Sequence, residues 1–133
     1  MSIIQGPLIS CQRYLEKCKV IDKATRFKNF IVTVYPIILR GVQYTVVIDG
    51  HHNLAAAKMV GIEPDYRPAG KKFLRIVNTL SEREREAHFI NNLTDCDYYY
   101  VETGEVVEAL LIPDTSCKFA AHAGNQWIFG GAQ

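Results

Sequence analysis

Val46-Val47-Ile48-Asp49-Gly50-His51-His52-Asn53-Leu54-Ala55-Ala56-Ala57-Lys58 contains the strongest structural signals in this chain. The β-branched residues up to Ile48 predict a strand, and the alanines after Leu54 have high helix propensity. Glycine at position 50 permits a tight bend between the two elements. The segment therefore predicts a strand, a sharp turn and a helix, with both histidines at the start of the helix.

The start of this helix is the predicted functional site. The first amides of a helix have no acceptor within the helix and carry partial positive charge, which favours phosphate and other anions. The candidate phosphate-binding residues are Gly50, His52, Asn53 and Leu54. Histidine titrates near neutral pH, so one histidine is a candidate general acid or base with Asp49 orienting it. The candidate catalytic residues are Asp49, His51 and His52.

Two other interpretations of these side chains stay open on the residues alone. Asp49, His51 and His52 could form part of a site for Mg²⁺ or another divalent ion, but no further residue at a metal-binding spacing completes a ligand set. We therefore assign no metal ligand. In the second interpretation Asp49 caps the helix or turn, and one histidine packs in the core with its nitrogens hydrogen-bonded.

The composition predicts a single globular domain. The chain has 133 residues, which is enough for one domain with a core and too few for two ordinary domains. Its net charge of +1 lacks the basic excess that makes nucleic-acid binding an electrostatic default. The sequence has neither a long apolar run nor a signal-peptide pattern, so we expect a soluble, cytoplasmic protein with reduced cysteines and no membrane partner.

Upstream of the central stretch we expect a short amphipathic helix over residues 10–20, and a turn or second helical piece over 22–28. Cys11 and Cys18 are seven residues apart, so they would share one face of that helix and pack in the core. The next apolar segments, 36–39 and 44–48, predict a β-hairpin.

Downstream, the helix from about His52 is expected to end at Gly61, a residue suited to the left-handed conformation that closes helices. We expect a strand over residues 62–66 and then an exposed loop over 67–72. Ser81-Glu82-Arg83-Glu84 matches a capping box, which predicts a helix to about Asn91.

The last third of the chain is harder to interpret. His88, on the capping-box helix, is expected to be at the surface or partly buried. Residues 98–101 and 106–112 predict a second hairpin, with a helix over 105–110 as the alternative. The segment from Pro113 onward is expected to pack onto the domain, and His122 within it is a conjectural addition to the site.

The motif residues resemble a known family. Tyr35-Pro36-Ile37-Ile38, then Asp49-Gly50-His51-His52 followed by Leu54-Ala55-Ala56-Ala57-Lys58 and Gly61, are similar to the signature region of the ParB/sulfiredoxin-like superfamily. The signature region spans residues 35–66, about a quarter of the chain, and resembles most closely the small ParB-like nucleases. The resemblance implies an α+β fold, with a single ParB-like domain over residues 1–133 and a small mixed β-sheet flanked by helices.

The same resemblance implies binding of a nucleotide or nucleic-acid phosphate at the turn, with nuclease or phosphotransferase activity as an open question. Sulfiredoxins have a cysteine where this chain has His51, so cysteine-based sulfinic acid reduction is not expected. Asn53 stands where most relatives have arginine, and a neutral amide replaces a charged, forked donor. The alternative function is therefore a non-catalytic interaction or regulatory protein, with a protein partner, that keeps the fold.

Overall fold

The computed structural model describes residues 3–13, 15–91 and 96–115. Cys117, His122 and the rest of the segment from residue 116 onward lie outside the described residues. The elements in chain order are β1 (Leu8–Ser10), α1 (Lys17–Arg26), β2 (Ile31–Leu39), β3 (Val42–Asp49), α2 (His51–Val60), β4 (Asp65–Pro68), α3 (Lys71–Val77), α4 (Glu82–Asn91), β5 (Tyr99–Tyr100) and a 3₁₀ turn, η1 (Glu108–Leu110).

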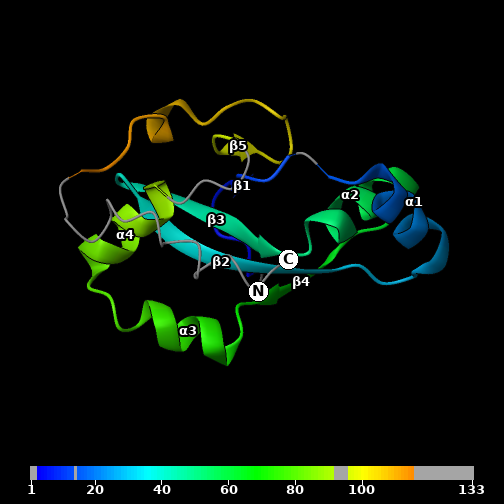
Figure 1. Cartoon of the computed structure of the whole chain (residues 1–133), viewed down its shortest axis with the longest axis horizontal. Helices are drawn as coiled ribbons and strands as arrows, with labels where there is room; N and C mark the ends of the chain where they lie inside the picture. The colour runs from blue at the N-terminus through cyan, green and yellow to red at the C-terminus, as the bar shows by residue number, and fades with distance from the viewer. Residues whose placement is uncertain (1–2, 14, 92–95, 116–133) are drawn as a thin grey trace.

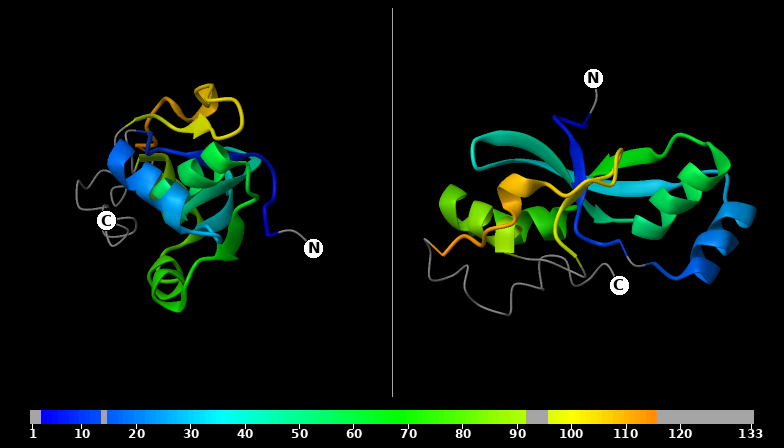
Figure 2. Two further views of the ribbon diagram at one scale, coloured as in Figure 1. Left: turned by 90° about the vertical axis from the view of Figure 1, so that its right-hand side faces the viewer. Right: turned by 90° about the horizontal axis from the view of Figure 1, so that it is seen from above.

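The strands form one mixed sheet in the order β4-β2-β3-β1-β5. β2 and β3 are antiparallel, β1 pairs with β3 in parallel, and β4 pairs with β2 in parallel. Figures 1 and 2 show α1 and α2 together at one end of the sheet, with α4 toward the opposite end. The predicted α+β class, with a small mixed sheet flanked by helices, is confirmed.

The predicted hairpin and the helix after it are also confirmed. β2 and β3 are joined by a two-residue turn at Arg40 and Gly41, both with positive φ, as in the type I′ turns that suit hairpins. Helix α2 begins at His51 and ends before Gly61, which has φ 73° and donates its N–H to the Ala57 carbonyl. These elements follow from local turn and capping signals.

Helix α4 begins with the predicted capping box. Ser81 N–H donates to Glu84 Oε1 at 3.0 Å, and Glu84 N–H donates to Ser81 Oγ at 3.2 Å. The expectation for His88 was wrong, because its side chain is 0% exposed among Ala87, Phe89 and Ile90 of the same helix. Burial lowers the pKa of His88, and Glu84 acts in the opposite direction.

The predicted position of the N-terminal helix, residues 10–20, was wrong. Residues Leu8–Ser10 form strand β1, and the helix begins only at Lys17. The strand forms because Leu8 and Ile9 pair with the buried part of β3, a long-range contact that the local pattern does not encode. Helix α1 instead presents Val20 to a core cluster with Phe30 and the alanines of α2. Consequently Cys11 is buried as expected, whereas Cys18 is exposed.

The predicted loop over residues 67–72 was also wrong. Strand β4 extends to Pro68, and helix α3 already begins at Lys71. Phe73, Leu74 and Ile76 of this helix pack against the main core. The paired lysines suggested an exposed loop, but burial of the apolar residues after them stabilises a helix.

The segment after Tyr98 matches neither predicted alternative, because residues 106–112 form neither a strand nor an α-helix. A single antiparallel bridge joins Tyr99 to Val106, and a 3₁₀ turn follows at Glu108–Leu110. The Tyr98 hydroxyl donates to the Phe89 carbonyl, and the Tyr99 hydroxyl donates to the Gln12 carbonyl. These tyrosines therefore connect neighbouring elements rather than forming an exposed aromatic strip.

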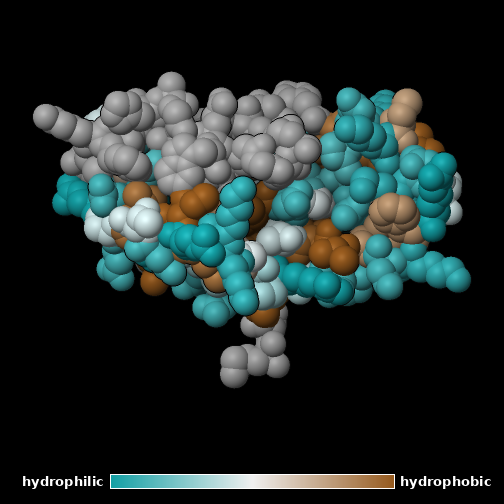
Figure 3. Space-filling view, turned by 60° about the horizontal axis from the view of Figure 1, so that its bottom comes forward, coloured by the Kyte–Doolittle hydropathy of each residue, from teal (hydrophilic) through white to brown (hydrophobic). Residues whose placement is uncertain are grey.

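The surface of the described residues is mixed in character. Figure 3 shows apolar side chains exposed in separate places among hydrophilic ones on one face. Within the residues that the structure describes, no helix is both long and apolar enough to span a membrane.

The turn at Gly50 offers a stability prediction. A Cβ atom at Gly50 would lie 2.5 Å from the Ile31 carbonyl oxygen and 3.1 Å from Val32 Cα, and its φ is 87°. At Gly61 the φ is also positive, but a Cβ would meet no atom within 4 Å. We expect Gly61→Ala to lower the free energy of unfolding by about 1 kcal/mol, and Gly50→Ala to cost about 1–3 kcal/mol more because of the clash. Urea denaturation measures both, and equal losses would contradict the close contact.

Candidate functional site

The strand-to-helix turn occupies the end of β3 and the start of α2. The Gly50 N–H donates to Asp49 Oδ1 at 2.7 Å, and the Leu54 N–H donates to the Gly50 carbonyl at 2.9 Å. Because the Leu54 bond is the first of the helix, the amides of residues 51–53 precede any acceptor within it. The side chain of Leu54 is buried. Of the predicted phosphate-binding residues, Gly50 and Leu54 therefore already use their amides within the turn.

Asn53 joins this turn to strand β2. Its Nδ2 donates to the Ile31 carbonyl at 2.8 Å. Its Oδ1 is buried and has no hydrogen-bond partner among the described residues. Asn53 thus holds the helix start against the neighbouring strand.

His51 is held by the N-terminal segment. Its Nδ1 lies 3.3 Å from the hydroxyl of Ser10, which is 1% exposed. The same hydroxyl accepts the Gln12 N–H at 3.2 Å. Ser10 therefore orients the His51 ring through Nδ1.

His52 has a different partner. The Glu16 N–H donates to His52 Nε2 at 3.3 Å, so this nitrogen accepts and the ring is neutral in this arrangement. Partial burial lowers the pKa of His52, and the positive charges of Lys19 and Lys23 lower it further, with Glu16 opposing them. Protonation at Nε2 would break the bond to Glu16, the residue that immediately precedes α1.

A cavity of about 570 Å³ opens at the turn. Helix α1 contributes Lys19 and Lys23, which are one helical turn apart and therefore lie on the same side of the helix. Lys19 also lies 3.7 Å from the exposed carboxylate of Glu16. The lining therefore combines two lysines and two histidines with one carboxylate, Asp49. The lining residues are Gln12, Lys19, Lys23, Ile31, Thr33, Asp49, Gly50, His51, His52 and Asn53.

The structure thus brings the predicted residues Asp49, Gly50, His51, His52 and Asn53 to one cavity. The sequence did not predict the contributions of Lys19, Lys23, Ser10 and Gln12. The spacing of the two lysines was a usable signal, but only for a helix that begins at Lys17. A helix over 10–20 ends before Lys23.

Other basic residues near the motif in sequence have different roles. Lys58 Nζ donates to the Val101 carbonyl at 2.6 Å, and Arg40 Nη1 donates to the Ala109 carbonyl at 2.7 Å. Asp65, a downstream carboxylate, forms an ion pair with Arg67 at 2.8 Å. None of these residues lines the cavity.

In the part of the chain that the structure describes, no group of three or more His, Cys, Asp or Glu side chains has an arrangement that could hold a metal ion.

Comparisons of the chain with protein-family models, curated proteins and solved structures found no match.

The effect of the Lys19 and Lys23 charges can be tested through the pKa of His52. In the double variant Lys19→Met/Lys23→Met we expect the pKa of His52 to rise, because two nearby positive charges that disfavour the charged ring are removed. NMR titration of the ring protons measures this. Lys17→Met is the matched control, because Lys17 is exposed on the same helix and does not line the cavity. An unchanged His52 pKa in the double variant, or an equal rise in the control, would contradict the arrangement.

Proposed function

We propose that this chain is a ParB-like domain that binds the phosphate of a nucleotide or nucleic acid in the cavity at the Asp49–Asn53 turn. The observation that carries the proposal is that Lys19 and Lys23 line the same cavity as the start of helix α2. Ammonium groups and the first amides of a helix both favour an anion, and here the residues that carry them line one cavity. Lys23 Nζ lies 5.0 Å from the centroid of the Phe27 ring and Lys19 Nζ lies 3.7 Å from Glu16 Oε2, so both side chains would turn toward a bound anion. Partial burial is the largest cause of the lowered pKa of His52, and the charges of Lys19 and Lys23 lower it further.

The size of the cavity supports a ligand larger than inorganic phosphate. About 570 Å³ lies within the range of small-molecule sites, which are commonly about 300–1,000 Å³. Ile31, Thr33 and Gln12 border it beside the charged groups. We infer that the phosphate lies toward the helix start and the lysines, while the rest of the ligand contacts these less polar residues.

Within this proposal the two histidines have different roles. His51 is the candidate for moving a proton to or from a water or a leaving oxygen, because it lines the cavity and Ser10 orients its ring through Nδ1. His52 is a positioning residue, because its Nε2 accepts the Glu16 N–H and thereby links the starts of the two helices. Lys19, Lys23 and the first amides of α2 would stabilise charge on the phosphate during phosphoryl transfer or phosphodiester hydrolysis.

The second candidate function is a phosphate-binding or protein-binding regulatory domain without catalysis. The hydrogen bond from Asn53 to the Ile31 carbonyl favours it, because this position stabilises the turn rather than supplying a charged phosphate ligand. The carboxylate of Asp49 beside the helix start also reduces the attraction for an anion. Both candidates predict binding, and only the first predicts turnover.

Phosphate binding can be measured by adding inorganic phosphate, ATP, CTP or short DNA, each with and without Mg²⁺, while following the His51 and His52 ring signals by NMR. We expect at least one of these ligands to shift both rings. In Lys19→Met/Lys23→Met we expect roughly tenfold weaker binding at low salt, from about 0.5–1 kcal/mol for each lysine. Lys17→Met should bind like the wild type. Unperturbed rings with every ligand would contradict the proposed site.

Turnover separates the two functions. With the ligand that binds, we expect His51→Ala to reduce product formation by about 10²-fold or more, the usual range for loss of a general acid or base. His52→Ala should reduce it less, because a positioning role is indirect. Binding without turnover in the wild type would favour the regulatory function, and equal rates in the wild type and His51→Ala would remove His51 from catalysis.

A further inference from the structure

In the part of the chain that the structure describes, about half of strand β2 has a strand partner on one side only. Strand β4 pairs only with Ile31–Val34 of β2 and ends at Pro68, opposite Val34. Residues 35–39 of β2 continue along β3, and on their other side no strand of the described chain pairs with them. Over residues 35–39, the backbone groups that point away from β3 therefore pair with no other strand of the described chain.

The direction of the backbone groups follows from the hairpin. A two-residue turn makes Leu39 and Val42 a hydrogen-bonded pair, and such pairs alternate along an antiparallel ladder. Pro36 and Ile38 therefore direct their backbone groups away from β3. Phe30 is an even number of residues before Pro36, so its backbone groups also point away from β3. Its carbonyl accepts the Asp65 N–H at 2.8 Å on that side. The open edge thus presents two carbonyls, of Pro36 and Ile38, and one N–H, of Ile38.

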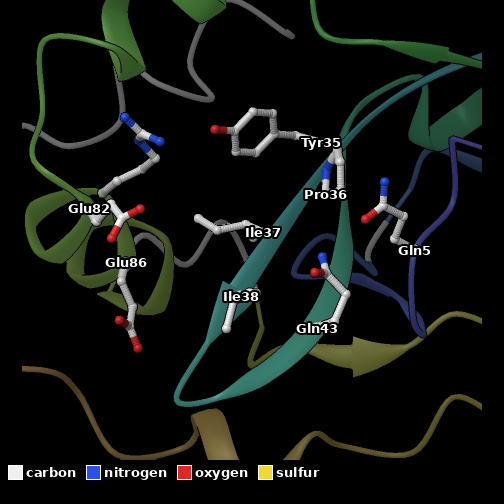
Figure 4. Close-up of a pocket in the computed structure, with 9 residues that line it drawn as sticks. Gln5, Tyr35, Pro36, Ile37, Ile38, Gln43, Glu82 and Glu86 are labelled. Atoms are coloured by element: carbon white, nitrogen blue, oxygen red, sulfur yellow. The ribbon is translucent and has the colours of Figure 1, made fainter.

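A second cavity, of about 320 Å³, follows this edge. Four consecutive residues of β2, Tyr35 to Ile38, line it. Because consecutive side chains of a strand point to opposite faces, a cavity that all four reach lies along the edge. Figure 4 shows Glu82 and Glu86 on one side of this strand and Gln5 and Gln43 on the other. We call this cavity the edge groove.

The edge groove is rich in hydrogen-bond acceptors and carries net negative charge. Helix α4 supplies the carboxylates of Glu82 and Glu86, and Glu86 Oε2 accepts the Arg40 N–H at 2.6 Å. Arg85, the cation that lines the groove, directs its guanidinium to the carbonyls of Val77 and Leu80, each at 3.2 Å. Nε and Nη2 of Arg85 are therefore directed to the end of α3, and the two carboxylates with the one guanidinium leave the groove with a net charge of −1.

We propose that the edge groove binds an extended segment of a partner protein that carries a Lys or Arg next to an apolar residue. The partner residue opposite Ile38 would exchange two backbone hydrogen bonds with it, as in strand addition at a sheet edge. The Ile38 side chain is 58% exposed and offers an apolar contact. The basic side chain of the partner lies toward Glu82. Pro36 lacks an N–H and limits the pairing to a short segment.

The proposal is independent of the anion cavity. That cavity takes negative charge at the start of α2, whereas the edge groove takes positive charge between β2 and α4. The two share no lining residue, so failure of one leaves the other unaffected.

The test uses the full chain and the probe peptide acetyl-Val-Lys-Val-Lys-Val-amide. NMR titration should shift the amides of residues 37–40 and 82–86. A peptide with Glu in place of Lys should bind at least about tenfold more weakly, because it meets like charge. A peptide methylated at the amide nitrogens that pair with the edge should also bind at least about tenfold more weakly, because it cannot donate to the β2 carbonyls.

Matched variants test whether Glu82 supplies the negative charge that attracts the peptide. Glu82→Lys should weaken binding of the lysine peptide about three- to tenfold and improve binding of the glutamate peptide. Glu63→Lys is the control, since Glu63 is exposed outside the groove. If Glu82→Lys disturbs α4 by circular dichroism, Glu82→Gln replaces it, with a smaller loss expected. Equal binding of both peptides, shifts confined to residues outside 34–40 and 82–86, or an equal effect of the two Lys variants would overturn the proposal.

Discussion

The close contact between Gly50 and the backbone of β2 is the constraint on which the site depends. A Cβ at this position would lie 2.5 Å from the Ile31 carbonyl oxygen, so the turn can approach β2 only with glycine. Asn53, in the first turn of helix α2, donates to the same carbonyl. Together these contacts set the direction in which α2 leaves the sheet. Helix α1 packs on α2 through Val20, Phe30 and the alanines, and its lysines thereby reach the cavity.

Features of the fold that depend on residues close in sequence were predicted, and features that depend on long-range packing were not. The hairpin, the ends of α2 and the capping box at Ser81 follow from residues within a few positions of each other, and all were predicted. The start of α1, helix α3 and the burial of His88 depend on which apolar surface covers them, and these predictions failed. The same distinction holds for the site. The turn could be predicted from its own residues, whereas Ser10 and Glu16 contact the histidines only because β1 pairs with β3.

Asn53 has a structural role in the turn that the sequence did not indicate. Arginine at this position would supply a charged fork to a phosphate, whereas asparagine stabilises the turn and leaves positive charge to come from another element. Lys19 and Lys23 are in place to supply it. Phosphate binding in this chain is therefore proposed to rest on α1 and α2 together, and the packing between these helices becomes part of the site.

The most direct measurement of this account is the position of a bound phosphate analogue. Crystals soaked in tungstate, whose tungsten scatters anomalously, would show where a tetrahedral anion binds. The account predicts an anomalous peak in the cavity, against the amides of residues 51–53 and within reach of the Lys19 and Lys23 ammonium groups. Tungstate bound at other surfaces, with the cavity vacant, would contradict it.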